Sequence, residues 1–236
     1  MRLIKEGKTK DVYETDNGAV LILLFKDNIT GTDGKEDGGG NEVIGTKLGV
    51  GAATLGMSAR YFKLLEENSI KTHMVRANQQ DGDDRMMVYP AKTIGGDGLE
   101  FIKRYRATGS LRRRFPKLFK EGDHINITEI TCKDDAAGDP PMSDSIIIAA
   151  GLLDETELTD ICDLFDDACD LIREDLEMYG LELWDIKLEF GLINYEDSGS
   201  LWAVIDEIGP GNMRVYKDGK ELEKLELARL GLEGDD

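Results

Sequence analysis

Leu183-Trp184-Asp185-Ile186-Lys187-Leu188-Glu189-Phe190-Gly191 is followed, after a short polar segment, by Ala203-Val204-Ile205-Asp206-Glu207. Successive side chains of a strand point to opposite faces, so Asp185, Lys187 and Glu189 are expected to share one face. The other face is expected to lie in the core and to carry Trp184, Ile186, Leu188 and Phe190. The first segment therefore predicts a strand with one apolar and one charged face.

We expect the two segments to pair as an antiparallel hairpin in which Asn194 lies opposite Leu201. Glu189 then lies opposite Asp206, with the two Cβ atoms about 5 Å apart on one face. Two carboxylates this close repel each other unless a cation lies between them. Because Mg²⁺ binds oxygen ligands and keeps positions for substrate phosphates, the pair predicts a magnesium site in an enzyme of nucleotide-phosphate chemistry.

The composition excludes several classes of function. The 236 residues include 48 acidic and 29 basic side chains, for a formal net charge of -19, which disfavours nonspecific binding to nucleic acid or anionic membranes. The three cysteines, Cys132, Cys162 and Cys169, form no Cys-x-x-Cys pair and indicate neither a disulfide framework nor a zinc site. With no leader segment and no long apolar run, a soluble, untargeted cytoplasmic protein is expected.

The first third reads as short strands at residues 2–6, 11–14 and 19–25, followed by a polar loop at 26–41. A helix is expected at 42–68, although its glycines are unfavourable. Further strands are expected at residues 71–76, 85–91, 99–107 and 123–132. The strand-rich first third and the mixed remainder predict two lobes with a ligand cleft between them.

The clearest helix is expected at residues 155–179. Asp154 with Glu157 provides a start signal and Gly180 a stop signal. We interpret its acidic residues as the solvated face of the helix rather than as a binding site. Its apolar face is expected to carry Leu158, Ile161, Cys162, Phe165, Ala168, Cys169, Ile172, Leu176 and Tyr179.

Two basic segments are candidates for anion binding. Lys8 and Lys10 share a face beside Gly7 and suit polyphosphate as flexible point charges, although a surface turn is the alternative. Residues 104–114 hold five arginines, with Gly109-Ser110 expected to open a short helix. We favour anion binding there over ion pairing with the protein's own acids.

Two loops complete the set of candidate segments. Residues 133–141 place dense acids beside a lysine and could bind an amine or form a plain turn. Beyond Asp206 the chain breaks at Gly209-Pro210-Gly211, and Arg214 could hold an anion bidentately. His73 is interpreted as structural. With no P-loop and no side-chain nucleophile, the lysines, arginines and metal carboxylates favour ATP chemistry.

Four motifs together resemble the family of SAICAR synthetases, the phosphoribosylaminoimidazole-succinocarboxamide synthases of purine biosynthesis. They are Gly7-Lys8-Thr9-Lys10, the segment from Arg104 to Leu111, the loop from Lys133 to Pro140, and Asp185 to Gly191. The resemblance implies a two-lobed α+β fold akin to ATP-grasp and kinase-like nucleotide binders. In it, residues 1–92 form a small β-rich nucleotide lobe and residues 93–236 a larger, mixed substrate and metal lobe, with the ATP cleft between them.

The resemblance also implies site residues, with ATP and Mg²⁺ as cofactors. The residues assigned to catalysis are Lys10, Asp33, Lys133, Lys187 and Asp206. Those assigned to the nucleotide are Lys8, Lys10, Met87, Glu189 and Asp206, and the magnesium ligands are Glu189 and Asp206. Those assigned to the substrates are Arg104, Ser110, Lys133, Asp139 and Arg214.

In the implied reaction, ATP activates the 4-carboxylate of carboxyaminoimidazole ribonucleotide, and the amine of L-aspartate displaces phosphate to form an amide. At least a homodimer is implied, with small-molecule substrates and no nucleic acid or membrane partner. The chain departs from the family pattern at Gly209 and Gly211, at Lys103, and in its shorter C-terminal region. The alternatives are a paralogous ligase for another amine, a small-molecule kinase, and a non-catalytic nucleotide-binding protein.

Overall fold

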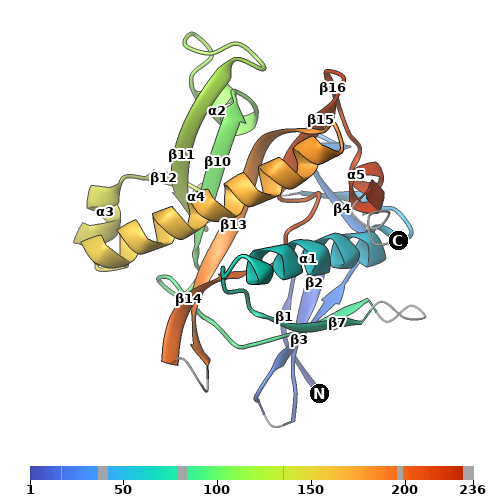
Figure 1. Ribbon diagram of the computed structural model, residues 1–236, viewed down its shortest axis with the longest axis vertical. Coiled ribbons are helices and arrows are strands. Elements are labelled where there is room, and N and C mark those ends of the chain that lie inside the picture. The colour runs from blue at the N-terminus through green and yellow to red at the C-terminus, as the bar shows by residue number, and fades with distance from the viewer. Residues whose placement is uncertain (17, 37–41, 79–83, 135, 196–198, 231–236) are drawn as a thin grey trace.

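The computed structural model describes residues 1–16, 18–36, 42–78, 84–134, 136–195 and 199–230. Within these ranges the strands form three antiparallel sheets (Figure 1). The N-terminal sheet has, in spatial order, β1 (Arg2–Glu6), β2 (Lys10–Glu14), β3 (Leu21–Phe25), β8 (Arg85–Val88) and β7 (Met74–Asn78). The strands expected in these regions are confirmed, with their ends shifted by a few residues.

The large sheet is built around β13 (Glu182–Tyr195), the long strand that contains the opening sequence segment. β10 (Leu99–Arg106) and β15 (Met213–Lys217) flank it, and β14 (Gly199–Ile205) and β9 (Lys92–Thr93) pair with its second half. The remaining strands of this sheet are β11 (His124–Cys132), β12 (Pro141–Met142) and β16 (Lys220–Glu221).

A third, small sheet contradicts two of the sequence expectations. It consists of β5 (Lys35–Glu36), β4 (Asn28–Thr32) and β6 (Glu42–Thr46), where a loop and the start of a helix were expected. Its residues give little pattern to read, because β5 and most of β6 are exposed and only Ile44 of β6 packs on a small apolar cluster. Residues 37–41 of the expected loop lie outside the described residues.

Helix α4 (Glu155–Met178) confirms the clearest helix expected from the sequence. Asp154 Oδ1 accepts a hydrogen bond from Glu157 N at 2.9 Å, and Glu157 Oε2 accepts one from Asp154 N at 3.0 Å, which completes a capping box. The other helices are α1 (Val50–Glu67), α2 (Gly109–Arg114), α3 (Asp144–Ala149) and α5 (Lys224–Leu230). Within the described residues, no helix is long and apolar enough to cross a membrane.

The main core lies between α4 and the large sheet, which the helix crosses in Figure 1. Phe101 of β10, Phe165 of α4 and Phe190 of β13 meet there with ring centroids 5.2 to 6.1 Å apart. The same apolar cluster extends to Leu23 and Phe25 of the N-terminal sheet. The α+β expectation is confirmed, and the division into lobes at residues 92 and 93 stays a prediction.

Three side chains, one on strand β13 and two at the end of helix α4, do not lie on the faces where the sequence analysis expected them. Trp184 is only half-buried and stacks on Tyr216 at 3.6 Å, because a bulge between Leu183 and Asp185 shifts the pairing with β15. Tyr179, at the end of α4, is exposed. Asp175 is the exception to the solvated acidic face, since it is buried in a bidentate ion pair with Arg60 at 2.6 and 2.7 Å.

Candidate active site

The face of the large sheet opposite α4 carries charged residues of β10 and β13, whereas Lys103 of β10 lies on the α4 side, 2.9 Å from Asp166 of that helix. The β10–β13 register places Glu100 opposite Glu189 and Arg104 opposite Asp185, so these four side chains lie on one face. A cavity of about 730 Å³ opens on this face and is lined by residues of β10, α2, β13 and β15. The expected charged face of the opening segment is therefore confirmed.

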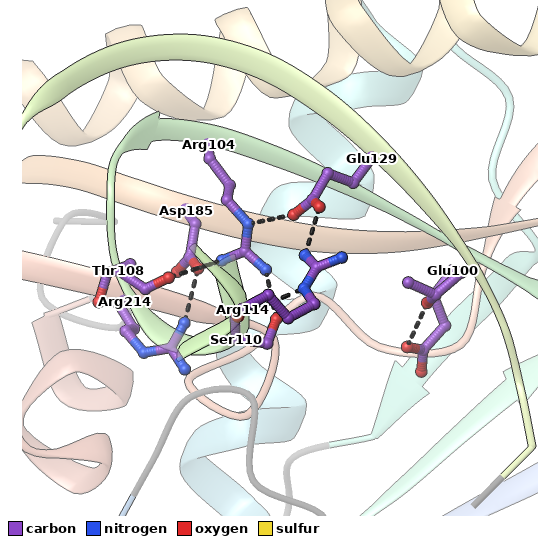
Figure 2. Close-up of polar contacts among 9 residues, drawn as sticks. Glu100, Arg104, Thr108, Ser110, Arg114, Glu129, Asp185 and Arg214 are labelled. Carbon is purple, nitrogen blue, oxygen red and sulfur yellow. Dashed lines mark hydrogen bonds and ion pairs between the residues drawn. The ribbon is translucent and has the colours of Figure 1, made fainter. Parts of the chain in front are cut away.

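An arginine–carboxylate network forms one wall of the cavity (Figure 2). Arg104 is buried and donates from Nη1 to Asp185 Oδ2 at 2.6 Å, from Nε to Glu129 Oε2 at 2.7 Å, and from Nη2 to Ser110 Oγ at 2.9 Å. Arg214 donates from Nη1 to the same Asp185 oxygen at 2.6 Å. The structure thus brings together Arg104, Ser110 and Arg214, which the resemblance assigned to substrate binding.

Glu129 is a site residue that the sequence analysis missed. It bridges two arginines, accepting from Arg104 through one carboxylate oxygen and pairing with Arg114 through the other (Figure 2). Pairing with the protein's own acids, the less favoured interpretation of the arginine segment, therefore holds for several of its members. The only available signal for Glu129 was its place in an alternating strand, which does not by itself point to a carboxylate partner.

Two lysine–glutamate pairs lie on the same charged face. Lys187 Nζ is 2.5 Å from Glu100 Oε1, and Lys133 Nζ is 2.7 Å from Glu189 Oε1. Thr131 Oγ1 donates to the other oxygen of Glu100 at 3.3 Å. Glu100 was also missed, although it precedes Arg104 by four residues on an alternating strand and lines the cavity. The lysines give each of the opposed glutamates a partner, because an unpaired buried carboxylate is costly.

Lys10 and Asp206 meet where the N-terminal sheet faces the large sheet. Lys10 is buried, with its Nζ 2.7 Å from Asp206 Oδ1 and paired also with Glu207. His73 Nε2 donates to the Asp206 carbonyl oxygen at 2.9 Å, and burial lowers the His73 pKa to about 4. The imidazole is therefore neutral at pH 7, which agrees with its structural interpretation.

The expected hairpin register is wrong by one residue. Asn194 pairs with Ser200, not Leu201, and Glu189 pairs with Ile205. A slip of one residue normally moves a side chain to the other face. Here β14 ends at Ile205 and Asp206 has a φ of +72°, so the alternation no longer applies at Asp206. The carboxylate still lies within electrostatic reach of Glu189.

The electrostatics of this carboxylate pair fit a bound cation. Burial, together with the Asp206 charge, raises the pKa of the Glu189 carboxyl. Burial would also raise the Asp206 pKa, but the ammonium groups of Lys10 and Lys133 outweigh it and lower that pKa. Among the described residues no group of three or more His, Cys, Asp and Glu side chains forms a metal site. Two carboxylates are a donor set that suits Mg²⁺, which prefers oxygen ligands and would complete its coordination with phosphate and water oxygens.

The remaining residues implied by the resemblance are placed less closely together. Asp33 is exposed, with a φ of +53°, in the turn between β4 and β5. Lys8 lines the cavity from the loop before β2, so it does not share a strand face with Lys10. Met87 pairs with Ile22, which places its side chain on the sheet face opposite Lys10. Asp139 lines the cavity and accepts from Asp134 N at 3.0 Å.

The loop after Asp206 is held by its backbone. Asn212 Oδ1 accepts from Gly209 N at 3.2 Å, and Asn212 O accepts from Lys187 N at 2.7 Å, which fixes the loop beside β13. A Cβ atom at Gly209 would lie 2.8 Å from Thr54 Cγ2, whereas one at Gly211 would meet nothing within 4 Å. A side chain at position 209 would therefore require Thr54 to move.

Residues 3–228 match the family model described as SAICAR synthetase. The chain belongs to the SAICAR synthetase family. A phosphoribosylaminoimidazole-succinocarboxamide synthase of Clostridium tetani is 42% identical over 234 residues, covering 99% of this chain and 100% of that protein. The resemblance read from the four sequence motifs is confirmed.

Solved structures of SAICAR synthetases share the fold. The crystal structure of the synthase from Ehrlichia chaffeensis has a TM-score of 0.81 and 29% identity, covering 98% of this chain and 92% of that chain. A SAICAR synthetase in complex with ADP has a TM-score of 0.78 and 28% identity, covering 93% and 87%. The arginine network and the lysine–carboxylate pairs described above therefore lie within a SAICAR synthetase fold.

Proposed function

We propose that the chain is an ATP-dependent ligase that joins the carboxylate of carboxyaminoimidazole ribonucleotide to the amine of L-aspartate, giving SAICAR, ADP and phosphate. The observation that carries this proposal is the convergence of an arginine wall and a lysine–carboxylate cluster on one charged face in a SAICAR synthetase fold. One ribonucleotide and one nucleotide, both phosphorylated, require two such cationic regions.

The arginine wall would receive the ribonucleotide. Arg104 and Arg214 share the Asp185 carboxylate, which fixes both guanidinium planes before any substrate arrives. Ser110 adds a hydroxyl that is already hydrogen-bonded to Arg104. A preorganised wall of this kind binds anionic groups without reordering long side chains, so more of the contact energy is retained as affinity.

The lysine–carboxylate cluster would receive ATP. Glu189 and Asp206 would hold Mg²⁺, which would neutralise charge on the phosphates, while Lys10 and Lys8 would contact the phosphates directly. The Lys10 and Lys133 side chains that now pair with these carboxylates would be free to turn toward phosphate oxygens once a cation took their place. That a SAICAR synthetase of this fold is known with ADP supports the assignment of ATP.

The chemistry follows from the poor leaving ability of a carboxylate oxygen. Transfer of the terminal phosphoryl group of ATP to the carboxylate converts that oxygen into part of a phosphate leaving group. Attack by the aspartate amine then forms the amide and expels phosphate. Lys133 and Lys187 lie on the charged face beside Glu189 and Glu100, where they would stabilise the negative charge that develops on the transferred group.

Release of ADP tests the proposal directly. With ATP, Mg²⁺ and the imidazole ribonucleotide held constant, ADP should form when L-aspartate is added and not when it is omitted. Equal rates with other amines would favour the paralogous ligase that Gly209 and Gly211 suggest, an alternative that the comparisons do not favour. Binding of Mg-ATP without turnover under every substrate combination would refute a ligase.

Four further proposals accompany this function. We propose that residues 1–92 form the nucleotide lobe and residues 93–236 the substrate and metal lobe. Asp33, Met87 and Asp139 are retained as the reacting-group, nucleotide and substrate residues that the resemblance implied. A cytoplasmic location and at least a homodimer are also proposed, and light scattering of the purified chain would test the second of these.

A further inference from the structure

The arginine segment contains one guanidinium that is unlike its neighbours. The other four all form ion pairs: Arg104 with Asp185 and Glu129, Arg106 with Glu182, Arg112 with Glu121, and Arg114 with Glu129. In the part of the chain that the structure describes, the Arg113 guanidinium forms no hydrogen bond or ion pair. Arg113 is nevertheless a lining residue of the 730 Å³ cavity, whereas Arg112 is not.

The charged groups of this wall carry a net positive charge, which favours binding of an anion. Four guanidinium groups face two carboxylates, so four positive charges minus two negative charges leave a net charge of +2. The groups counted are Arg104, Arg113, Arg114, Arg214, Glu129 and Asp185. A phosphate monoester carries about -1.5 to -2 at pH 7, which this excess matches.

The arginines of the wall differ in the hydrogen bonds and ion pairs that they would lose on turning toward an anion. Arg104 is buried, and its Nε, Nη1 and Nη2 atoms already donate to Glu129, Asp185 and Ser110. Turning it toward a ligand would break all three of these contacts and leave Asp185 with Arg214 and Glu129 with Arg114 as their remaining arginine partners, which is unfavourable in a largely buried network. Arg113 is exposed and would exchange only water for a charge-assisted contact, although solvent screening weakens that contact.

We propose that Arg113 is a further substrate-binding residue, which contacts the phosphate group of the ribonucleotide from the solvent side of the cavity. Figure 2 shows Arg104, Arg114 and Arg214 held by Glu129 and Asp185, and these three arginines would form the fixed wall behind that phosphate. The inference deepens the proposed function and rests on it for the identity of the ligand.

Two adjacent variants give a matched test. Arg113→Gln should raise the KM for the ribonucleotide about tenfold, as expected for one lost charged contact at a partly solvated site, with kcat within about twofold. Arg112→Gln removes the same charge from the same short helix but does not line the cavity, so its KM should equal that of the unmodified chain. Melting curves for both variants verify folding, and Arg113→Lys should recover part of the loss.

Direct titration of the ribonucleotide without ATP should show the same difference between the variants. With the corresponding nucleoside, which lacks the phosphate, Arg113→Gln and the unmodified chain should bind equally. Three outcomes would each overturn the inference. The two glutamine variants could bind the ribonucleotide equally well, or the loss of affinity in Arg113→Gln could persist with the nucleoside. The third is that the substitution changes the KM for aspartate instead of that for the ribonucleotide. If the unmodified chain binds the ribonucleotide but forms no SAICAR, only the proposed function is refuted. The role of Arg113 is still tested by the titration, which does not depend on turnover.

Discussion

Strands β10 and β13 present two buried faces that are made of alternate residues of the same segments. One face packs Phe101 and Phe190 against α4 and is mostly apolar, with Lys103 paired to Asp166 of that helix. The other buries Arg104, Asp185 and Glu189, and each charge there requires a specific partner. Buried ion pairs are often no more stabilising than apolar residues of equal volume. Stability alone therefore does not explain the charged face, whereas binding of charged substrates does.

The comparison predicts that changes on the apolar face alter stability without altering the site. Phe165→Ala should lower the free energy of unfolding by about 3–5 kcal/mol, because it leaves a cavity among Phe101, Phe190 and their neighbours. Urea unfolding measures this loss, and the KM values at low temperature should stay within about twofold. The exposed Asp167→Ala on the same helix is the control and should cost no more than about 0.5 kcal/mol. A large KM change in Phe165→Ala would show that the two faces are coupled.

Changes on the charged face should have the opposite signature. Asp206→Asn should reduce kcat at least about 100-fold, since it removes a proposed metal ligand at nearly constant volume, and changes one shell further out already cost 10–100-fold. Steady-state ADP release measures the effect, and the melting temperature should change little. Asp163→Asn, an exposed change on α4, should leave kcat unaltered. Full activity in Asp206→Asn would remove that residue from the metal site.

The apolar face was the part of this comparison that could be predicted from the sequence. Helix α4 could be predicted from its capping box and its regular apolar period, because both signals lie within the helix's own stretch of sequence. Sheet β4–β5–β6 gives no such signal, because its strands are short, β5 and most of β6 are exposed, and consecutive residues of β4 are buried, so no alternation can be read. Trp184 was misplaced for a related reason, since a single bulge reverses the alternation on which the expectation depended.

The charged face could be predicted only in part. The types and strands of Arg104, Asp185 and Glu189 followed from alternation and from the family motifs. The partners Glu129 and Glu100 did not, because each is set by strand order and register, which bring together residues far apart in the chain. The one-residue error in the β13–β14 register has the same origin, and it was harmless only because the backbone of Asp206 leaves the strand conformation.

Loss of a single arginine from the wall gives a smaller and more specific effect. Arg214→Ala should weaken ribonucleotide binding by about 2 kcal/mol, roughly 30-fold, because a buried charged contact is removed. The fold should survive, since Asp185 keeps its 2.6 Å contact with Arg104. Titration of the ribonucleotide measures the change. Arg173→Ala on the outer face of α4, where that arginine pairs with Glu177, is the control. Unchanged affinity would place the anion elsewhere in the cavity.

The smallest effect is expected at Gly109, whose backbone packs closely against the guanidinium of Arg214. Gly109 has a φ of +57°, and a Cβ atom there would lie 2.9 Å from Nη2 and 3.0 Å from Nη1 of Arg214. Gly109→Ala should therefore displace the guanidinium and also cost about 1 kcal/mol through its left-handed backbone. Titration should show a several-fold weaker ribonucleotide complex, less than in Arg214→Ala.

Gly219→Ala separates the two contributions of that change. Gly219 has a φ of +77° in the turn between β15 and β16, and an added Cβ would meet nothing within 4 Å. It therefore carries a similar backbone cost without any contact to the wall, and should lower stability by about 1 kcal/mol while leaving affinity intact. If both alanine variants bound the ribonucleotide as tightly as the unmodified chain, the position of the Arg214 guanidinium would not limit binding. The charged face would then tolerate small displacements of its side chains, whereas the apolar face, which depends on close packing, would not.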